Sequence, residues 1–488
     1  MGSSRLLSMN MPAVVKKGLM GSLTSGGGDS YPDGLCDDAN GINSNITLIQ
    51  NLADLTPTIT DDFSSASNWN LDSTTTISSN ALNFEIDGSG GINQTNNGYR
   101  TLTSSVSNSF WTMEFKLTIS NYTASGNTDQ NTLYIGLTDT ADALNNSQDF
   151  LGLAISGNSG SEYICISRDS GQPADAPTPT GASFSRSVQA ETVYVRMIRN
   201  SSTLEISLFS DADFSTLLET QTQSISGTVQ NLDNIQFLTL HGNTTGSPEL
   251  DGKVENLEIF DGVVGGDVKV GSGCYSFNGT DSEVNCGSAS DWEFLNDKST
   301  DWSIAFWAIN KQGTTTNAKN ILATVDNGGS SDGLGIDTRT SQGVRVFFQF
   351  DNGSKSGTVT WNSVIPTSTT EWFHLSFVCN ASAEEVSLYK NGSLVSTQSV
   401  GGDGIGSGGQ TDSPLCLGAR VDTYYYEMFL DDMLLATRKL TTDEISDLAD
   451  GNAVSTLSDK SGIVAYYNFD STTSTDGTAN RLQNEACP

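Results

Sequence analysis

Basic residues are scarce in this sequence. It contains 23 Lys and Arg residues against 57 Asp and Glu residues among 488, so its formal net charge is −34 and its isoelectric point is about 4.1. Proteins that bind nucleic acid need a basic surface that displaces counterions from the phosphates. The composition therefore argues against nucleic acid and against an anionic membrane surface as partners. Solubility, salt tolerance and cation binding are the uses left for the acidic surface, and solubility is the commonest of them.

Long hydrophobic runs are also missing. No stretch of 18 apolar residues occurs, so no membrane insertion is expected. The first residues, "MGSSRLLSMNMPAVVKKGLMGSLTSGGG", lack the continuous apolar stretch of about 7–15 residues that a secretory signal requires. We expect neither a signal peptide nor a transmembrane segment, so a place outside the cell would require processing or release by lysis.

Cysteines are few, and no CxxC pair occurs, which argues against a dense disulfide framework and against a zinc site. The seven are Cys36, Cys165, Cys274, Cys286, Cys379, Cys416 and Cys487. Five of them follow residue 270. Two readings stay open for that part of the chain, namely one or two disulfide bridges or free, half-buried thiols in strands.

The sequence is rich in short alternating runs that are typical of β-strands, separated by turn residues. Four blocks recur in the same order in the two halves of the chain. The pairs are "FWTMEFKLTI" (110–119) with "DWSIAFWAIN" (301–310), "VYVRMIRNSSTLEISLF" (193–209) with "FHLSFVCNASAEEVSLY" (373–389), "IQFLTLHG" (235–242) with "SPLCLGAR" (413–420), and "KVENLEIF" (253–260) with "FLDDMLLA" (429–436). The duplication predicts two β-sandwich domains, 61–262 and 266–488, joined by a Gly-rich hinge. Residues 1–60 are predicted to be an extended N-terminal arm.

One segment, "FLDDMLLATRKLTTDEISDLADG" (429–451), predicts a strand, a basic turn and a helix. Thr441 and Glu444 form a capping box, Ile445, Leu448 and Ala449 form one apolar stripe, and Gly451 ends the helix. We expect this helix to lie across an edge or end of the sandwich. The matching strand at 253–260 has no such helix after it.

The second half resembles the laminin-G-like, or concanavalin A-like, jelly rolls. The residues that carry the resemblance are "CYSFNGTDSEVNCG" (274–287), "WSIAFWA" (302–308), "EWFHLSFVCNASAEEVSLYKNGSLV" (371–395) with a turn at Asn391-Gly392, "LCLGAR" (415–420), the segment 429–451 and "GIVAYYNFD" (462–470). The resemblance covers most of 270–475, and the first half shares it through the repeat. It implies an all-β fold of two tandem jelly-roll β-sandwich domains.

Some glycoside hydrolases also have a fold of this type, and these enzymes need two carboxylates that face each other across a cleft. In the hydrolases that this fold resembles, those carboxylates lie on one strand as a Glu-x-Asp-x-x-Glu or similar motif. Glu427, Asp431 and Asp432 do not have that spacing, and the Asp-Asp pair is predicted to point to opposite faces of its strand. The two histidines, His241 and His374, lie within predicted strands without a nucleophile nearby and are predicted to be structural. We therefore expect no enzymatic activity and no catalytic residue.

Two kinds of binding remain. Aromatic rings at a sandwich edge can stack on sugars, and in an extended "DTYYYEM" Tyr424 and Tyr426 would share one face while Tyr425 takes the other. Ordinary cross-strand packing of these tyrosines is the alternative. The resemblance also implies a structural Ca²⁺ held by Asp431, with Glu255 as its counterpart in the first half. An aspartate on a surface strand that accepts a backbone N–H is the alternative for Asp431.

The sequence favours a non-enzymatic structural protein of a virion surface, such as a spike, fibre or capsid decoration. Its first 60 residues would dock on other copies or on other structural proteins, and its jelly rolls would bind a glycan or a host surface receptor. The alternative is a secreted or cell-surface adhesin or lectin of a marine-type microbe. A glycoside hydrolase with an unrecognised site is the third hypothesis.

Overall fold

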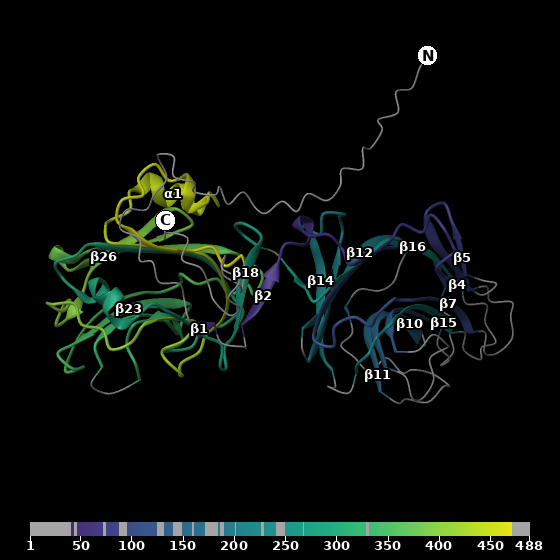
Figure 1. Cartoon of the computed structure of the whole chain (residues 1–488), viewed down its shortest axis with the longest axis horizontal. Helices are drawn as coiled ribbons and strands as arrows, with labels where there is room; N and C mark the ends of the chain where they lie inside the picture. Colours follow the sequence, from purple (N-terminus) through teal and green to yellow (C-terminus); the bar gives the residue numbers. More distant parts are fainter. Residues whose placement is uncertain are drawn as a thin grey trace, which may run out of the picture. The chain divides into compact units, whose positions relative to one another are not determined.

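The computed structural model describes residues 41–42, 46–71, 75–86, 95–123, 131–139, 149–158, 161–170, 184–185, 190–200, 202–225, 229–240, 249–266, 268–327 and 331–470. The chain divides into two compact units, residues 49–268 and residues 1–48 with 269–488. Each unit is a β-sandwich of two layers with an apolar core of its own (Figure 1). The all-β fold class of two tandem sandwiches is confirmed. We call residues 49–268 the first sandwich and residues 269–488 the second sandwich.

The first sandwich consists of two antiparallel sheets. The upper sheet in Figure 1 has the order β14 (Leu217–Ser224), β13 (Thr203–Phe209), β12 (Glu191–Asn200), β8 (Phe110–Thr123), β16 (Glu249–Asp261), β6 (Ala81–Ile86) and β5 (Thr75–Ser78), with β3 (Ile59–Asp61) paired to β16. The lower sheet has the order β11 (Ser161–Ser170), β10 (Asp149–Asn158), β9 (Asn131–Thr138), β15 (Asn234–Leu240), β7 (Thr95–Thr101) and β4 (Asn70–Leu71). Ile49 and Gln50, the last residues of β2 (Thr47–Gln50), pair in parallel with β17 (Val264–Gly265), and η1 (Leu52–Asp54) follows.

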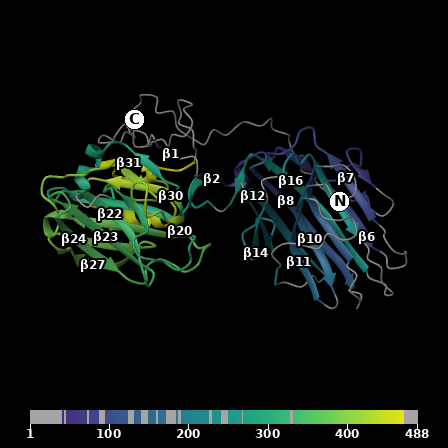
Figure 2. The ribbon, with the colours of Figure 1, turned by 90° about the horizontal axis from the view of Figure 1, so that it is seen from below.

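The second sandwich repeats this plan. One sheet has the order β18 (Gly273–Asn278), β30 (Glu427–Ala436), β20 (Trp302–Asn310), β25 (Phe373–Asn380), β26 (Glu385–Lys390) and β27 (Ser393–Ser399), with β31 (Ile463–Tyr467) paired to β30. The other has the order β1 (Gly41–Ile42), β19 (Val284–Cys286), β29 (Leu415–Leu417), β21 (Asn320–Ala323), β22 (Gly333–Arg339), β23 (Gly343–Phe350), β24 (Lys355–Trp361) and β28 (Gly401–Gly402). Figure 2, seen from below, shows β22, β23 and β24 side by side. Short 3-10 turns complete the unit as η2 (Ala289–Asn296), η3 (Ala381–Ala383) and η4 (Val454–Thr456).

Alternation along the central strands builds both cores. In β8 the residues Trp111, Met113 and Phe115 are buried in the first core, and in β20 the residues Trp302, Ile304 and Phe306 are buried in the second. These are the positions that the two sequence blocks align. Because successive side chains of a strand point to opposite faces, the residues between them face outward.

Strand pairing follows the duplication residue by residue. In the first sandwich Lys116 of β8 pairs with Tyr194 of β12 and with Glu255 of β16. In the second sandwich Trp307 of β20 pairs with His374 of β25 and with Asp431 of β30. These two sets of three are the ones that the sequence alignment matches. The two halves therefore share one register, and their outer faces can be compared position by position.

A β-bulge occurs at the same aligned position in both halves. The register of β16 against β8 shifts between Glu255 and Glu258, and the register of β30 against β20 shifts between Ala305 and Trp307. The bulged residues, Asn256 and Asp432, both have a left-handed backbone, with φ of 51° and 47°. A bulge sets two residues of one strand against one residue of its partner, so the alternation of faces breaks there.

The predicted helix is α1 (Thr442–Ala449). Thr441 Oγ1 accepts the N–H of Glu444 (3.2 Å), and Glu444 Oε2 accepts the N–H of Thr441 (2.8 Å), so both halves of the capping box form. Arg438, from the basic turn, donates to both oxygens of the Glu444 carboxylate at 2.8 and 2.6 Å. Gly451 ends the helix at φ 85°.

The helix lies on the outer face of a sheet, and the expected place across an edge or end was wrong. Ile445 and Leu448 are buried against Ala305, Val378 and Leu434 of the three central strands β20, β25 and β30. The remaining members of this cluster are Ala436, Leu440, Val454, Leu457, Ile463 and Tyr466. Figure 1 shows α1 above the layer that contains β26. The outer face at these central positions is apolar, so burial there removes more apolar surface from water than an edge would.

Two further expectations can be compared with the described residues. Cys274, Cys286, Cys379 and Cys416 are free and buried, which is the free-thiol reading, while Cys36 and Cys487 lie outside the described residues. From the segment predicted as an arm, residues 1–60, Gly41–Ile42 pair with β19, and Ile59 and Thr60 pair with β16. Among the described residues, the structure has no helix with the length and apolar character that a membrane crossing requires.

Candidate functional site

The predicted tyrosine face does not form as expected. Tyr424 has a left-handed backbone with φ 53°, so the segment is not extended and Tyr424 and Tyr426 do not share a face. Tyr426 is buried in the core, and its hydroxyl donates to Asn310 Oδ1 at 3.0 Å. Tyr425 is half-buried. Tyr424 is 41% exposed and is the ring of the three that solvent can reach most readily. Ligand binding by these tyrosines stays a prediction.

Asp431 and Asp432 lie on the outer side of β30 together. The prediction that they point to opposite faces was wrong, because the bulge at Asp432 breaks the alternation. Asp431 pairs with Trp307, whose indole N–H donates to the Leu448 carbonyl of the helix at 3.1 Å. Asp432 accepts a hydrogen bond from the hydroxyl of Tyr466, which belongs to the cluster beneath the helix.

Asp431 is fully buried and only half satisfied. Its Oδ2 accepts the backbone N–H groups of Lys269 (3.0 Å) and Val270 (2.9 Å), and its Oδ1 has no hydrogen-bond partner among the described residues. Burial raises the pKa of Asp431 well above its ordinary value and that of Asp432 to about 7. Asp431 therefore accepts backbone N–H groups, as the alternative reading has it, although it is not at the surface.

The fit of this position to Ca²⁺ can be judged from its donors. Calcium takes six to eight oxygen ligands. Asp431 Oδ1 is one free oxygen, but no group of three or more His, Cys, Asp or Glu side chains that could hold a metal ion gathers anywhere in the described ranges. The Glu255 carboxylate faces the ammonium groups of Lys116 (2.8 Å) and Lys253 (3.1 Å), and these ion pairs lower its pKa although its partial burial raises it. Calcium at Asp431 and Glu255 stays a prediction, which calcium titration of the protein and of D431N checks.

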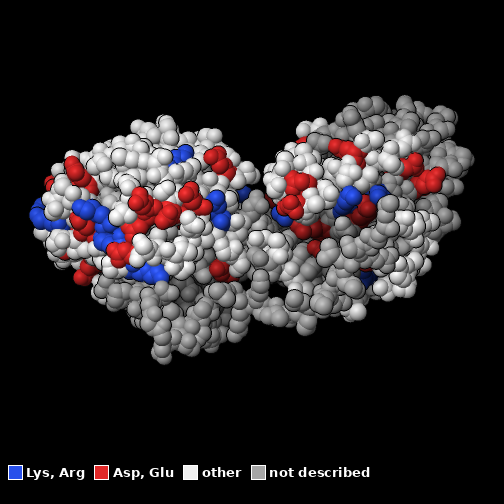
Figure 3. Space-filling view, turned by 90° about the horizontal axis from the view of Figure 1, so that it is seen from above, with Lys and Arg blue, Asp and Glu red and all other residues white. Residues whose placement is uncertain are grey.

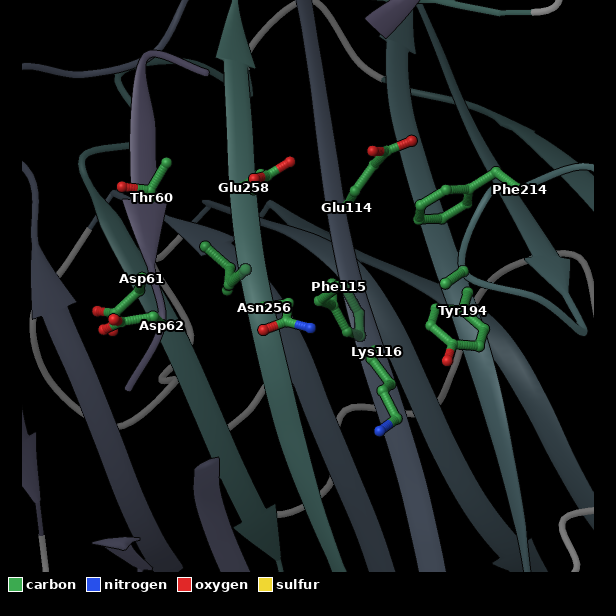
Figure 4. Close-up of a pocket in the computed structure, with 12 residues that line it drawn as sticks. Thr60, Asp61, Asp62, Glu114, Phe115, Lys116, Tyr194, Phe214, Asn256 and Glu258 are labelled. Atoms are coloured by element: carbon green, nitrogen blue, oxygen red, sulfur yellow. The ribbon is translucent and has the colours of Figure 1, made fainter. Parts of the chain in front are cut away.

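A cleft of about 300 Å³ lies on the outer face of the upper sheet of the first sandwich. Its floor is formed by β16 and β8, with β3 on one side and β12 on the other (Figure 4). Side chains from all four strands line it, together with a loop from residues 210–216. The lining residues are Thr60, Asp61, Asp62, Glu114, Phe115, Lys116, Tyr194, Ala212, Phe214, Asn256, Leu257 and Glu258. Figure 3, which looks onto the upper side of Figure 1, shows basic and acidic atoms next to each other on this sandwich.

Two aromatic rings form one wall of the cleft. Tyr194 and Phe214 pack edge to face with their ring centroids 6.1 Å apart. The loop that carries Phe214 is fixed by Asp211, whose carboxylate accepts the N–H groups of Ser215 (3.0 Å) and Thr216 (2.8 Å). Figure 4 shows both rings on the same side of the strands that form the floor. The wall is therefore a preformed apolar surface next to polar groups.

Two carboxylates meet across the floor. Glu114 of β8 pairs directly with Glu258 of β16, and their side chains are neighbours on the outer face. Glu114 is 7% exposed, and its Oε1 accepts a hydrogen bond from Arg196 Nε at 2.6 Å. Glu258 is half-buried and forms no hydrogen bond or ion pair within the described part of the chain. Burial raises the pKa of both carboxyl groups, although the Arg196 guanidinium opposes this rise at Glu114.

Sequence reasoning missed this cleft. The search for paired carboxylates looked along single strands, whereas Glu114 and Glu258 come from strands more than 130 residues apart and meet by cross-strand pairing. One signal was available in the alignment of the halves. Where the second half has Ala305 and Leu434, the first half has Glu114 and Glu258, so its outer face could have been predicted to stay exposed.

The comparisons with known proteins agree with the fold. A family model described as the concanavalin A-like lectin/glucanases superfamily, a laminin-G type, matches residues 278–446. No curated protein matches the sequence.

Several solved structures show weak similarity, with TM-scores below 0.3. The binding domain of botulinum neurotoxin serotype G is 16% identical, with a TM-score of 0.28, over 37% of this chain and 43% of that domain, so less than half of its length is spanned. The carbohydrate recognition domain of Emp47p is 14% identical, with a TM-score of 0.29, over 46% of this chain and 99% of that one. The CBM2 module of the evolved Dit of Lactobacillus casei BL23 phage J-1 is 7% identical, with a TM-score of 0.29, over 44% and 97%.

The family match lies within the second sandwich, which the structure builds from two β-sheets. Residues 278–446 of this chain are similar to the laminin-G type of the concanavalin A-like lectin/glucanases superfamily, and the all-β sandwich fold agrees with that similarity.

Proposed function

We propose that this protein is a non-enzymatic carbohydrate-binding protein of a virion surface, a spike, fibre or capsid decoration that attaches to a glycan on the host. The observation that carries carbohydrate binding is the cleft of the first sandwich. It combines an aromatic wall of Tyr194 and Phe214 with a polar floor, in a chain that also carries a lectin-type domain. Sugar sites use this combination, because aromatic rings cover the apolar face of a pyranose while polar groups hold its hydroxyls.

Hydrogen-bonding groups for hydroxyls are available in the cleft. Asn256 is exposed at the bulge, and Thr60 lies across from Glu258 in the register of β3 and β16. Neither side chain forms a hydrogen bond to another described residue. Because the bulge is fixed by the pairing of β16 with β8, the amide of Asn256 is held at the centre of the floor (Figure 4).

A second contact point is the exposed Tyr424 at an end of the second sandwich. Its backbone carbonyl accepts the N–H of Asn320 at 2.9 Å, which ties the loop to β21. The nearby Arg420 is held by Asp326 and Gln349. A fixed loop that presents one ring suits stacking on a sugar, so we propose Tyr424 as the weaker of two sugar contacts.

A glycan array with the full chain tests carbohydrate binding. We expect hits that Tyr194→Ala and Phe214→Ala each reduce roughly 2- to 12-fold, since stacking on an aromatic ring contributes roughly 0.5–1.5 kcal/mol. Tyr424→Ala is expected to have a smaller effect. An array without hits, using protein whose fold is verified by its thermal melt, would remove glycan attachment and leave a structural role.

The virion assignment and the absence of enzymatic activity need their own measurements. Electron micrographs of native particles labelled with an antibody against the second sandwich are expected to show the protein on the particle surface. Labelling on microbial cells instead would favour an adhesin. Polysaccharide hydrolysis that E258Q or E114Q abolishes would show that the cleft is a glycosidase site and would overturn the non-enzymatic proposal.

A further inference from the structure

Acidic side chains outnumber basic side chains around the cleft. Five carboxylates and four cations lie in it or next to it among the described residues. The carboxylates are Asp61, Asp62, Glu114, Glu255 and Glu258, and the cations are Arg100, Lys116, Arg196 and Lys253.

Each cation is already engaged. Arg100 donates to Asp61 Oδ2 (2.7 Å), Lys116 and Lys253 share Glu255, and Arg196 donates to Glu114. Arg196 is also covered by aromatic rings, since its guanidinium carbon lies 4.7 Å from the centroid of Phe214 and 5.3 Å from that of Phe209. The four cations therefore pair with three carboxylates, and the one spare positive charge lies at Glu255, where Lys116 and Lys253 share a single carboxylate.

Two carboxylates are left without a cation of their own. Glu258 stands on the floor, half-buried, and Asp62 stands exposed on the rim, where it accepts the N–H of Ser64 (3.0 Å). Glu114 adds a further acceptor, because the hydrogen bond from Arg196 uses its Oε1 and no described residue donates to its Oε2, although the residue is only 7% exposed. Carboxylate oxygens of this kind accept hydrogen bonds from an ammonium group more strongly than from a hydroxyl.

From this geometry we propose that the cleft selects a sugar that carries a protonated primary amine, with its ammonium group against Glu258 and its ring against Tyr194 and Phe214. This proposal rests on the proposed function, since it names the class of carbohydrate that the same cleft binds. Sugars that carry a carboxylate or a sulfate are disfavoured at this position, because they would face Glu258 and Asp62, whereas the spare positive charge of Lys116 and Lys253 is held at Glu255. The volume of about 300 Å³ suits one or two pyranose rings.

The experiment compares disaccharides that differ in charge, and it includes an amine that has no sugar ring. The full chain is titrated by calorimetry at pH 7 and 150 mM salt with the β-1,4-linked glucosamine dimer, with its fully N-acetylated form, with a dimer that contains glucuronate and with n-butylamine. We expect the glucosamine dimer to bind at least tenfold more tightly than the N-acetylated dimer, and the glucuronate dimer to show no binding. Butylamine, which lacks the ring, is expected to bind far more weakly than the amino sugar.

Three variants locate the binding. Glu258→Gln keeps the shape and removes the charge, and it is expected to weaken the glucosamine dimer about 10- to 100-fold, the range for a charged hydrogen bond. Glu85→Gln, at an exposed carboxylate of β6 that is not among the lining residues, removes the same charge and is expected to change nothing. Leu394→Ala, at an exposed residue of β27 in the second sandwich that belongs to neither proposed sugar contact, is likewise expected to leave this binding unchanged.

The outcomes separate the two proposals. If the neutral dimer binds as tightly as the amine and only Tyr194→Ala weakens it, selection of amines is wrong and carbohydrate binding stands. If butylamine binds as well as the amino sugar, the cleft recognises an ammonium group alone and the sugar part is wrong. If Glu85→Gln weakens binding as much as Glu258→Gln, the attraction comes from the overall charge of −34 and not from the cleft. If no dimer binds to folded protein, this inference is overturned, and the glycan array decides separately on the proposed function.

Discussion

The strands β8, β12 and β16 of the first sandwich and β20, β25 and β30 of the second share one pairing register. Their outer faces differ, because the first is open to solvent and the second is covered by a helix. In the first sandwich the face carries Glu114, Lys116, Tyr194, Arg196, Glu255 and Glu258, and in the second the aligned positions carry Ala305, Trp307, His374, Ser376, Asp431 and Leu434. The first face is lined by charged groups and holds a cleft. The second face is apolar at its centre and is covered by the helix α1.

The difference shows that strands in the same pairing register can form either a covered apolar face or an open polar face. Burying Leu434 and Ala305 removes apolar surface from water, so a cover stabilises the second sandwich. Burying Glu114 and Glu258 under an apolar helix would instead cost the desolvation of two carboxylates. The side chains at a few outward positions therefore decide whether the face is closed as part of a core or stays open as a site.

The largest loss of stability is expected from a variant that weakens the packing of α1 on the outer face of the second sandwich. Leu448→Ala opens a cavity at a side chain that is 2% exposed, and we expect a loss of about 3 kcal/mol in the free energy of unfolding. Urea unfolding followed by tryptophan fluorescence measures it, since the Trp307 indole donates to the Leu448 carbonyl. The exposed Asp447→Ala is the control, with a change below about 0.5 kcal/mol. A loss below 1 kcal/mol for Leu448→Ala would mean that the face does not need its helix.

A smaller loss of stability is expected from breaking an ion pair on the outer face of the first sandwich. Arg196→Met leaves the Glu114 carboxylate buried without its cation, and we expect the free energy of unfolding to fall by about 2 kcal/mol. Combining it with Glu114→Leu is expected to recover most of this loss, because no uncompensated charge then remains. Denaturant unfolding of both variants measures the coupling. Additive losses in the double variant would show that the pair does not act as a unit.

The cap of the helix contributes less. Thr441→Ala removes the side chain that accepts the Glu444 N–H, and about 1 kcal/mol of stability is expected to go with it. Thr442→Ala, at the exposed neighbouring position, serves as the matched control with no measurable change. Thermal melts of the two variants are sufficient for this comparison. Equal melting temperatures would show that the bidentate contact of Arg438 holds the helix start without the cap.

The smallest effect at neutral pH is expected at His374. Burial, reinforced by the Lys269 ammonium group, lowers the pKa of His374 to about 3, while an unfolded histidine has a pKa of about 6.5. Between these values the unfolded chain binds a proton that the folded protein does not, so acidification from pH 6.5 toward 3 destabilises the fold. His374→Phe should be within about 1 kcal/mol of the parent at pH 7 and should lose less stability on going to pH 4.5. Tyr194→Phe, at the aligned position of the first sandwich, should follow the parent at both pH values.

The local features of the second half were predictable because short-range chemistry determines them. Asn391 and Gly392 both have a positive φ, of 47° and 77°, as the predicted hairpin turn between β26 and β27 requires. The capping box of Thr441 and Glu444 forms as the spacing indicates. The register of the repeat followed from alternation, since a slip by one residue would turn every apolar side chain to the wrong face.

The predictions that were wrong concern features that depend on contacts between distant parts of the chain. The bulges at Asn256 and Asp432 interrupt the alternation that sequence reasoning assumes, so Asp431 and Asp432 came to lie on one side. The left-handed backbone of Tyr424 changed the arrangement of the three tyrosines in the same way. Asn256 and Asp432 are residue types that tolerate a left-handed backbone, but their identity alone does not place a bulge, and a left-handed tyrosine has no such signal.

The sequence by itself determined the all-β class, the duplication, the similarity of the second half to laminin-G-like domains and the capped helix at Thr442–Ala449, because periodicity, turn residues and caps act over a few neighbouring positions. Only the tertiary structure decided where the helix lies and where a cleft forms. The helix covers the face on which the outward residues are apolar, and the cleft lies where Glu114 and Glu258 meet across two strands. Such cross-strand meetings are fixed by sheet pairing over more than a hundred residues, and no local pattern encodes them.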